Sequence, residues 1–441
     1  MAPSTAKSGT PYVSGPPEQL QFSEDAVKDV LTSAATALAQ HSSPSPGIAA
    51  RPSLERALNA IRRHLGMEVA FISEFVDGRR VFRHVDAQTA AAPIEVGGSD
   101  PLEDSYCQRV VDGRLPALIT DACLNAEALT LAATLALPVG AHLSVPIRLA
   151  DGQLYGTFCC FSRLADHSLT HRDLDMMRVF AQMAAEEIET ELKAREARRA
   201  VEERIETACS ADGLSMVFQP IVDVADARVG GFESLARFSQ QPLRSPDVWF
   251  AEAAQVGRAV EMETRAIRLA LAALEQLPPD IYVTVNTSPE TIVHGRFASV
   301  LQGYPLERIV VEVTEHQVVE RYEDIAAVML PLQAQGLRVA IDDAGAGYAS
   351  FRHILNLHPH IVKMDYSITH CIDVDRSRRA LAAAMHGFAA ETGCHIVAEG
   401  VETGAELDTL RRLGIGKAQG YHLGRPMPLD QAKGLVSRTA H

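Results

Sequence analysis

Short segments rich in β-branched residues alternate with helical patterns through the second half of this 441-residue chain. We predict eight strands there, at residues 215–221, 229–236, 282–286, 309–313, 338–342, 361–365, 395–399 and 418–421. Eight strands that alternate with helices over about 230 residues are typical of a (β/α)8 barrel. The sequence therefore predicts an α/β fold whose C-terminal part, residues 210–441, is a TIM-like barrel.

The preceding residues, 26–192, predict a smaller α+β domain with an antiparallel sheet flanked by helices. A helix over 53–65 leads into a strand at 67–75, and further strands are expected at 117–120, 143–149 and 154–162. Cys159 and Cys160 are adjacent on the last of these strands and must face opposite sides of the sheet. We expect one in the core and the other at a pocket or an interface.

A long helix is expected to connect the two domains. It begins near Thr170, keeps an apolar stripe to Leu192 and continues into the charged linker 193–209. A coiled coil between two protomers and a solvated linker helix both fit this pattern, and we expect a homodimer through the linker helix and the barrel. Residues 1–25 have the composition of a disordered tail and not of a signal peptide.

Net charge and cysteine content limit which classes of binding partner and which cellular compartment we expect. The formal net charge of -15 repels a nucleic acid polymer, and an anionic small molecule would need bound cations in its site. Seven scattered cysteines without a Cys-x-x-Cys pair fit a reducing, cytoplasmic setting. The uncharged stretch 128–147 is broken by Pro138, Gly140 and Pro146, so we expect a buried helix and strand and no membrane insertion.

Polar residues recur near the ends of the predicted barrel strands. They are Glu233, Asn286, Glu312, Asp342 with Asp343, Lys363 with Asp365, Glu399 and Gln419. Strand ends converge on one face of such a barrel, so the carboxylates in this set would crowd together and would need a cation to stay ionised. Oxygen ligands without His or Cys favour Mg²⁺ or Mn²⁺. Each acid taken alone could equally be a helix N-cap or a surface charge.

The adjacent pair Asp342-Asp343 is suited to bridging two ions. Two metal ions about 3.5–4 Å apart are the usual apparatus for attacking a phosphodiester. Lys363 would add a positive group that holds the attacking water or a phosphate oxygen. These residues predict a metal-dependent phosphodiester hydrolase.

The motifs of residues 207–437 resemble those of one family in both their order and their residues. They are Gln219-Pro220-Ile221-Val222, Glu233-Ser234-Leu235-Ala236-Arg237, Asn286-Thr287-Ser288, Glu312-Val313-Thr314-Glu315, Asp342-Asp343-Ala344-Gly345, Lys363-Met364-Asp365, Ala398-Glu399-Gly400-Val401-Glu402 and Gln419-Gly420-Tyr421. This set resembles the EAL domain, a bacterial signal-transduction family of cyclic di-GMP phosphodiesterase barrels whose first strand runs antiparallel to the others. The resemblance implies hydrolysis of cyclic di-GMP to linear 5′-pGpG by a metal-activated water.

The same resemblance implies a role for each matching residue. Glu233, Asn286, Glu312 and Asp342 would hold one Mg²⁺ or Mn²⁺ ion, and Asp342, Asp343 and Glu399 would surround a second. Lys363 would orient the water, and Glu399 is a candidate for assisting its deprotonation. Gln219, Arg237 and Gln419 would contact the substrate, while Glu315 and Glu402 would support the loop after the fifth strand.

The chain departs from the family pattern at two places, and the second leaves an alternative open. Ser234 stands where the family has Ala, a small-for-small change that should be harmless. Residues 344–350 read Ala-Gly-Ala-Gly-Tyr-Ala-Ser where the family usually reads Phe-Gly-Thr-Gly-Tyr-Ser-Ser. Lost packing and hydrogen bonds would loosen the loop that presents both aspartates. The alternative is therefore a catalytically weak or inactive receptor that signals by binding cyclic di-GMP.

The first domain resembles a GAF sensor domain over about residues 50–192. The matching segments are Ser105-Tyr106-Cys107, Leu118-Ile119-Thr120-Asp121-Ala122, Ser144-Val145-Pro146-Ile147 and Leu154-Tyr155-Gly156-Thr157-Phe158-Cys159. The resemblance implies an unidentified small ligand and regulation of the barrel. No cyclase signature fits between Leu192 and Leu214, so we expect the chain to degrade the messenger and not to make it.

Overall fold

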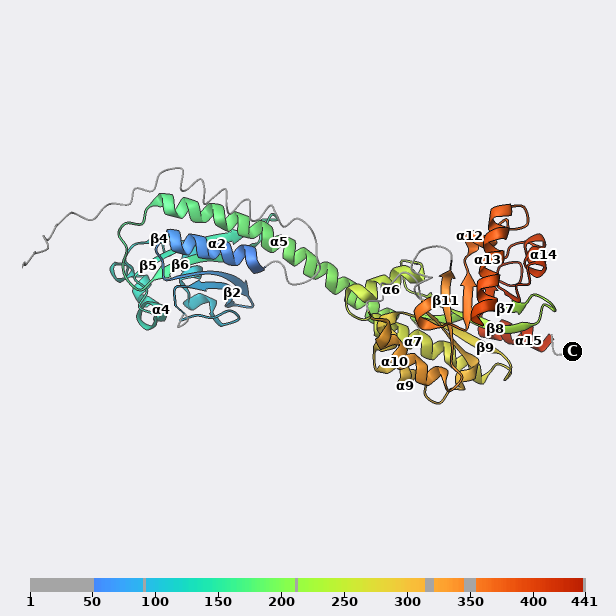
Figure 1. Ribbon diagram of the computed structural model, residues 1–441. Helices are drawn as coiled ribbons and strands as arrows, with labels where there is room; N and C mark the ends of the chain where they lie inside the picture. The colour runs from blue at the N-terminus through green and yellow to red at the C-terminus, as the bar shows by residue number, and fades with distance from the viewer. Residues whose placement is uncertain (1–50, 90–92, 211–212, 314–320, 345–353, 439–441) are drawn as a thin grey trace, which may run out of the picture. The chain divides into compact units, whose positions relative to one another are not determined.

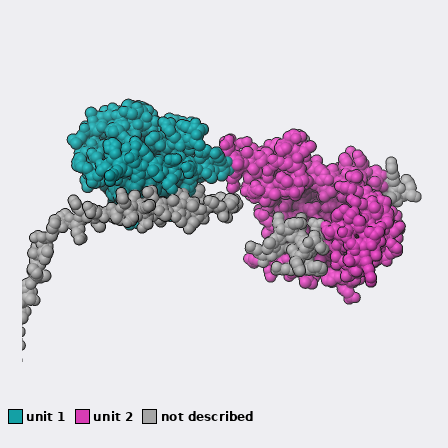
Figure 2. All heavy atoms as spheres, turned by 90° about the horizontal axis from the view of Figure 1, so that it is seen from above, with its two compact units in different colours: residues 1–195 teal, residues 196–441 magenta. Residues whose placement is uncertain are grey.

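The computed structural model describes residues 51–89, 93–210, 213–313, 321–344 and 354–438. The chain divides into two compact units, residues 1–195 and residues 196–441 (Figure 2). The tail expected over residues 1–25, the loop-supporting Glu315 and positions 345–350 of the variant loop lie outside the described residues.

Unit 1 is built from one sheet and several helices (Figure 1). Its strands are β1 (Val69–Val76), β2 (Arg79–Ala87), β3 (Ser99–Pro101), β4 (Leu118–Ile119), β5 (Ala141–Arg148) and β6 (Leu154–Ser162). Its helices are α2 (Arg51–His64), α3 (Tyr106–Val111), α4 (Ala132–Ala136) and the first part of α5 (His171–Ala208), with 3-10 turns at Leu102–Asp104, Ala122–Leu124 and Ala128–Thr130.

The sheet has the order β3-β2-β1-β6-β5-β4 with every pair antiparallel, which confirms the predicted α+β class. Helices α2 and α5 lie side by side on one face, where Leu58 and Phe180 pack with Phe158 of β6 (Figure 1). The other face packs against α3 and the short helices in a second core. Strand β6 supplies both cores because its successive side chains point to opposite faces.

Strands β2 and β3 were not expected from the sequence. Strand β2 follows β1 through Asp77-Gly78, whose φ angles of 49° and 72° are both positive. An Asp-Gly pair with positive φ at both positions is the favoured two-residue hairpin turn. The sequence therefore carried a local signal for this hairpin.

Helix α5 is continuous over 38 residues, as the helical pattern predicted. Residues 193–200 are all exposed. Ion pairs one turn apart run along this stretch, for example between Lys193 and Glu189 and between Arg198 and Glu202, at 2.7 and 2.9 Å. Such pairs stabilise a solvent-exposed helix by a few tenths of a kcal/mol each, roughly.

Unit 2 contains eight strands and the helices between them. The strands are β7 (Leu214–Asp223), β8 (Val229–Phe238), β9 (Tyr282–Thr287), β10 (Ile309–Val313), β11 (Arg338–Ala344), β12 (Ile361–Met364), β13 (His395–Ala398) and β14 (Lys417–Ala418). The described helices are α6 (Pro246–Gln255), α7 (Ala259–Leu271), α8 (Pro289–Val293), α9 (Arg296–Leu301), α10 (Tyr322–Gln333), α12 (Tyr366–Thr369), α13 (Arg376–Thr392), α14 (Gly404–Arg412) and α15 (Leu429–Arg438), with 3-10 turns at Ala272–Glu275 and Leu306–Arg308.

These strands close into a barrel in the order β10-β11-β12-β13-β14-β7-β8-β9. Strand β7 is antiparallel to both of its neighbours, and the other pairs are parallel. The barrel prediction and its reversed first strand are thus confirmed. The interior is filled by an apolar layer that includes Ile221, Val310 and Val397, so it is a packed core and not a pore.

The uncharged stretch 128–147 forms short helical turns followed by the buried strand β5, as the sequence predicts. Among the described residues, no helix combines the length and the apolar character that a bilayer crossing requires.

Candidate functional site

Strand register brings the candidate residues to one level of the barrel. On parallel strands β9 and β10, Asn286 and Glu312 are register partners. On antiparallel strands β7 and β8, Gln219 is the register partner of Glu233. Glu233 lies in the middle of β8 and not at its end, because β8 continues to Phe238. The predicted strand, 229–236, ends two residues before β8 does, so Glu233 lies farther from the end of its strand than the sequence predicts.

Lys363 is the centre of the site. Its side chain is only 2% exposed, and its ammonium group lies 2.9–3.3 Å from carboxylate oxygens of four residues on four different strands or strand ends. They are Glu233, Glu312, Asp342 and Glu399. The structure therefore brings together residues 130 positions apart in the sequence.

Burial and charge crowding set the protonation of these groups. Loss of water raises the pKa of Glu312 well above its usual range, because Lys363 only partly offsets the desolvation and the three neighbouring acids add to it. The pKa of Glu399 rises to about 8 for the same reasons. Burial alone would lower the pKa of Lys363, but its four carboxylate neighbours raise it well above its usual value. The lysine is held in its charged form.

The donor set fits divalent cations. Four carboxylates facing one ammonium group leave three negative charges in excess when all four are ionised. Oε1 of Glu312 is buried and has no hydrogen-bond partner among the described residues, so it offers a free ligand atom at this point. Hard carboxylate oxygens in this number suit Mg²⁺ or Mn²⁺.

Two glutamines extend the polar site around the barrel. The Gln419 side-chain amide donates to Glu233 and to Oε1 of Gln219, the latter at 3.0 Å. Gln219 in turn donates to the carbonyl of Gly424 at 3.1 Å. Both amides are buried. Their orientation is therefore fixed by hydrogen bonds before any ligand binds.

Glu263 on α7 supports the segment after Asn286 and was missed by the sequence analysis. Its carboxylate accepts hydrogen bonds from the backbone N–H and the hydroxyl of Ser288, at 2.8 and 2.9 Å. Ser288 caps helix α8 directly after β9. Nothing in a helical pattern distinguishes such a residue from any other helix glutamate, because its partner is 25 positions away.

The remaining candidates occupy less central positions. Arg237 is half-buried and donates to the carbonyl of its neighbour Ala236 at 2.8 Å. Asp365 is the N-cap of α12 and accepts from the backbone of Ser367, which is the structural role that a lone acid after a strand can have. Asp343 belongs to β11, but its side chain lies outside the described part of the structure.

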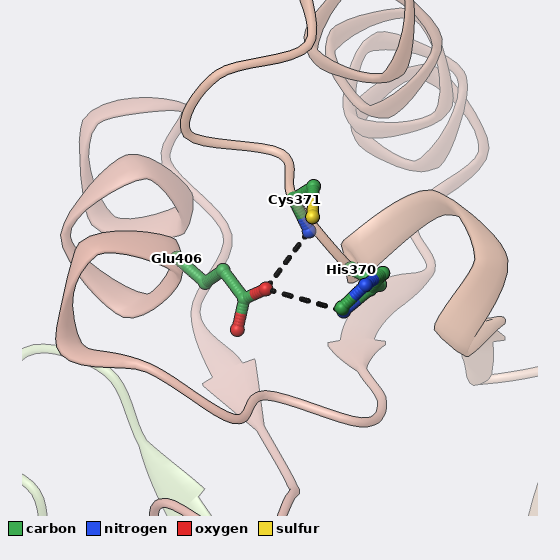
Figure 3. A group of neighbouring side chains, drawn as sticks. All are labelled: His370, Cys371 and Glu406. Atoms are coloured by element: carbon green, nitrogen blue, oxygen red, sulfur yellow. Dashed lines mark hydrogen bonds and ion pairs between the residues drawn. The ribbon is translucent and has the colours of Figure 1, made fainter.

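His370, Cys371 and Glu406 form a second polar group (Figure 3). Oε1 of Glu406 accepts from the backbone N–H of Cys371, and Oε2 accepts from the backbone N–H groups of Glu402 and Thr403, all at 2.8–2.9 Å. The same glutamate completes the capping box of α14. Its oxygens therefore tie two loops together, and Glu402 takes part through its backbone while its side chain is exposed.

Comparison with known proteins gives two family matches. A family model described as "EAL domain" matches residues 202–426, half of the chain, and one described as "GAF domain" matches residues 51–188. The "Uncharacterized protein y4lL" of Sinorhizobium fredii is 28% identical over 249 residues, which are 54% of this chain and 30% of that protein. The "Cyclic di-GMP phosphodiesterase PA2567" of Pseudomonas aeruginosa is 25% identical over 52% of this chain and 40% of its own length.

The chain thus spans less than half the length of these two relatives. Among solved structures, "EAL Enzyme Bd1971 - cAMP and cyclic-di-GMP bound form" matches 84% of this chain and 93% of its own, with a TM-score of 0.52 and 16% identity. At this identity the likeness concerns the fold.

Proposed function

The chain belongs to the EAL-domain family and carries a GAF domain before its barrel, and on that premise we propose that it hydrolyses cyclic di-GMP to linear 5′-pGpG. The observation that carries the proposal is the arrangement of four carboxylates around the buried Lys363. The printed name of the Pseudomonas relative supports the same substrate.

We assign the ion-binding role to the acids of this arrangement. Glu233, Asn286, Glu312 and Asp342 would hold one ion, and Asp342, Asp343 and Glu399 a second. Bound Mg²⁺ or Mn²⁺ ions supply an acidic water and neutralise charge on the phosphate. A bound cation would also satisfy Oε1 of Glu312.

The protein's own groups then hold and orient the reactants. Lys363 would orient the attacking water through its ammonium group, and Glu399, whose Oε1 lies 2.9 Å from that group, would accept the proton. The fixed amides of Gln219 and Gln419 would bind the substrate beside Glu233, and Arg237 would hold a phosphate oxygen by a charge-assisted hydrogen bond.

The direct test is to incubate the purified chain with cyclic di-GMP and Mn²⁺ and to follow the linear product by chromatography. We expect turnover that a chelator abolishes and that added Mn²⁺ restores. Tight binding of the nucleotide without turnover would select the receptor alternative instead. Neither binding nor turnover would refute both functions.

Calcium is expected to inhibit the reaction. Ca²⁺ prefers six to eight oxygen ligands at about 2.3–2.6 Å, whereas Mg²⁺ takes six at about 2.0–2.1 Å. A site built from a few carboxylates on rigid strands cannot easily expand to the calcium geometry. Initial rates with each metal alone, and with Ca²⁺ added to Mg²⁺, test this expectation. Equal turnover with Ca²⁺ and Mg²⁺ would contradict the metal assignment.

We also propose that the GAF domain regulates the barrel and that the linker helix supports a homodimer. Removal of residues 1–192 is then expected to change the specific activity, because the effector domain would be uncoupled from the catalytic one. The shortened chain keeps Ile205 and Ala208, which pack on the barrel unit. Rates measured side by side at equal barrel concentration decide the point. An unchanged rate with and without the domain would remove the regulatory role.

A further inference from the structure

Two cysteines meet inside unit 1, in the core on the sheet face away from α2 and α5. Cys107 comes from α3 and Cys159 from β6, 52 positions apart, and their sulfur atoms are 3.3 Å apart. Both side chains have no exposed surface. A disulfide bond is about 2.03–2.05 Å long. An approach of roughly 1.3 Å would therefore join the two sulfurs.

The surroundings of this pair are polar although the core is not. The guanidinium group of Arg80 donates to Cys107 Sγ at 3.2 Å. On the other side, the hydroxyl groups of Ser144 and Thr157 lie 3.1 and 3.2 Å from Cys159 Sγ. A cation and two hydroxyl groups next to two buried thiols can stabilise a negative charge on sulfur.

The two thiols are electrostatically unequal. Burial opposes ionisation of Cys107, but the hydrogen bond from Cys159 and the charge of Arg80 outweigh it and lower the pKa of Cys107 to about 6. Burial and the neighbouring Cys107 sulfur raise the pKa of Cys159 well above its usual value. One sulfur is thus prepared to act as the nucleophile and the other to keep its proton.

Cys160 provides the comparison within the same strand. It is equally buried but packs in the opposite core with Leu58 and Phe158. Burial raises its pKa far above the usual value of a thiol. The sequence predicts that one of the two adjacent cysteines lines a pocket or an interface, but both are fully buried and they differ in their partners instead.

We propose that Cys107 and Cys159 are a redox-active thiol pair that a small oxidant of the peroxide class converts to a disulfide. The Cys107 thiolate attacks one peroxide oxygen, the O–O bond breaks, and a sulfenic acid and a hydroxide ion form. The Cys159 sulfur then attacks the Cys107 sulfur, the S–O bond breaks, and a second hydroxide ion leaves. The two thiol protons convert both hydroxide ions to water. In total, two thiols are oxidised by two electrons and one peroxide is reduced.

Burial restricts the oxidant to a small molecule. The guanidinium group of Arg80 contacts Cys107 and also pairs with the partly exposed Asp100. We therefore expect a peroxide to reach sulfur by a small movement of this side chain, and a bulky disulfide such as oxidised glutathione to reach it much more slowly. Side chains alternate between the two faces of β6, so Phe158 and Cys160, the neighbours of Cys159, pack in the core that contains α5. A change at Cys159 on disulfide formation would therefore extend to that core.

The test uses the full chain and hydrogen peroxide. After exposure, the protein is denatured in N-ethylmaleimide, digested and mapped by mass spectrometry. We expect a Cys107–Cys159 cross-linked peptide that dithiothreitol removes, and the same yield in the control variant Cys160→Ser. In Cys159→Ala we expect a slower reaction, because Cys107 loses the hydrogen bond from Cys159, and we expect it to stop at a Cys107 sulfenic acid that dimedone traps when it is added with the denaturant. Oxidised glutathione should give the cross-link at least about 10-fold more slowly, because access limits thiol–disulfide exchange.

The mapping of the unmodified protein does not depend on whether a variant folds. Recovery of Cys107 and Cys159 as free thiols after the exposed Cys123 has been oxidised would overturn the proposal. So would a cross-link from Cys107 to Cys123 in place of Cys159. Equal rates with peroxide and oxidised glutathione would overturn the restriction to a small oxidant.

Discussion

Replacing Glu233 by Ala should lower kcat for cyclic di-GMP by about 10²- to 10⁴-fold, the range that several kcal/mol of lost metal stabilisation implies. Glu233 contacts Lys363 at 3.3 Å and also accepts a hydrogen bond from Gln419. The substitution therefore removes a proposed ion ligand and the hydrogen-bond partner of Gln419, which we propose binds the substrate. Steady-state kinetics and a calorimetric Mn²⁺ titration should both show the defect.

Ser234→Ala is the matched control for this experiment. Ser234 is the next residue on β8, is equally buried, and donates to the carbonyl of Thr284 away from the acids. Its loss should change stability by about 1 kcal/mol and leave kcat nearly unchanged. The proposed catalytic role of Glu233 would fail if both variants lost activity to the same extent, or if Glu233→Ala retained wild-type turnover.

Replacing Lys363 by Met should strongly destabilise the metal-free barrel. The substitution leaves four buried or half-buried carboxylates without their shared cation, and removing one partner of a buried ion pair costs about 3–5 kcal/mol. For a domain of this size we expect the melting midpoint to fall by roughly 6–20 °C. Saturating Mn²⁺ should restore more of this loss than the increase it gives to the wild-type protein, because the ions would replace the missing positive charge.

The measurement can be confined to the barrel. The chain has one tryptophan, Trp249, which is fully buried in unit 2, so its fluorescence reports the unfolding of that unit. Lys417→Met is the control, because Lys417 is a half-buried barrel lysine that lies over the ring of Tyr282 and pairs with none of the four acids. Equal Mn²⁺-induced shifts in wild type and Lys363→Met would argue against metal binding at these acids.

The barrel was predictable because its signals are local. Each strand is a short apolar run bounded by polar or helical residues, and residues 309–313 coincide with β10. The gathering of Glu233, Glu312 and Glu399 followed from the topology of the barrel alone. Neither the strands nor this gathering depends on a particular contact between side chains.

The contacts between distant side chains could not be predicted. Lys363 was expected to face a water or a phosphate oxygen, but its position among four carboxylates depends on the packing of the closed barrel. Likewise, Cys107 and Arg80 belong to patterns that look like an ordinary helix and strand. Their meeting with Cys159 is a property of the folded core, where no sequence spacing records it. The β1–β2 hairpin is different, because the Asp77-Gly78 pair is a local turn signal from which the hairpin could have been predicted.

The polarity of a single strand decides which mouth of the barrel receives the incoming chain. Leu214, the first residue of β7, pairs with Phe238, the last residue of β8, because these two strands run in opposite directions. The end of α5 therefore enters at the rim that presents Arg237, and Ile205 and Ala208 pack there with Phe238 and Trp249. Had β7 been parallel to its neighbours, α5 would have ended at the opposite mouth of the barrel, away from Arg237. If α5 conducts the regulation that we propose, its movement would be applied at the mouth that carries the proposed site.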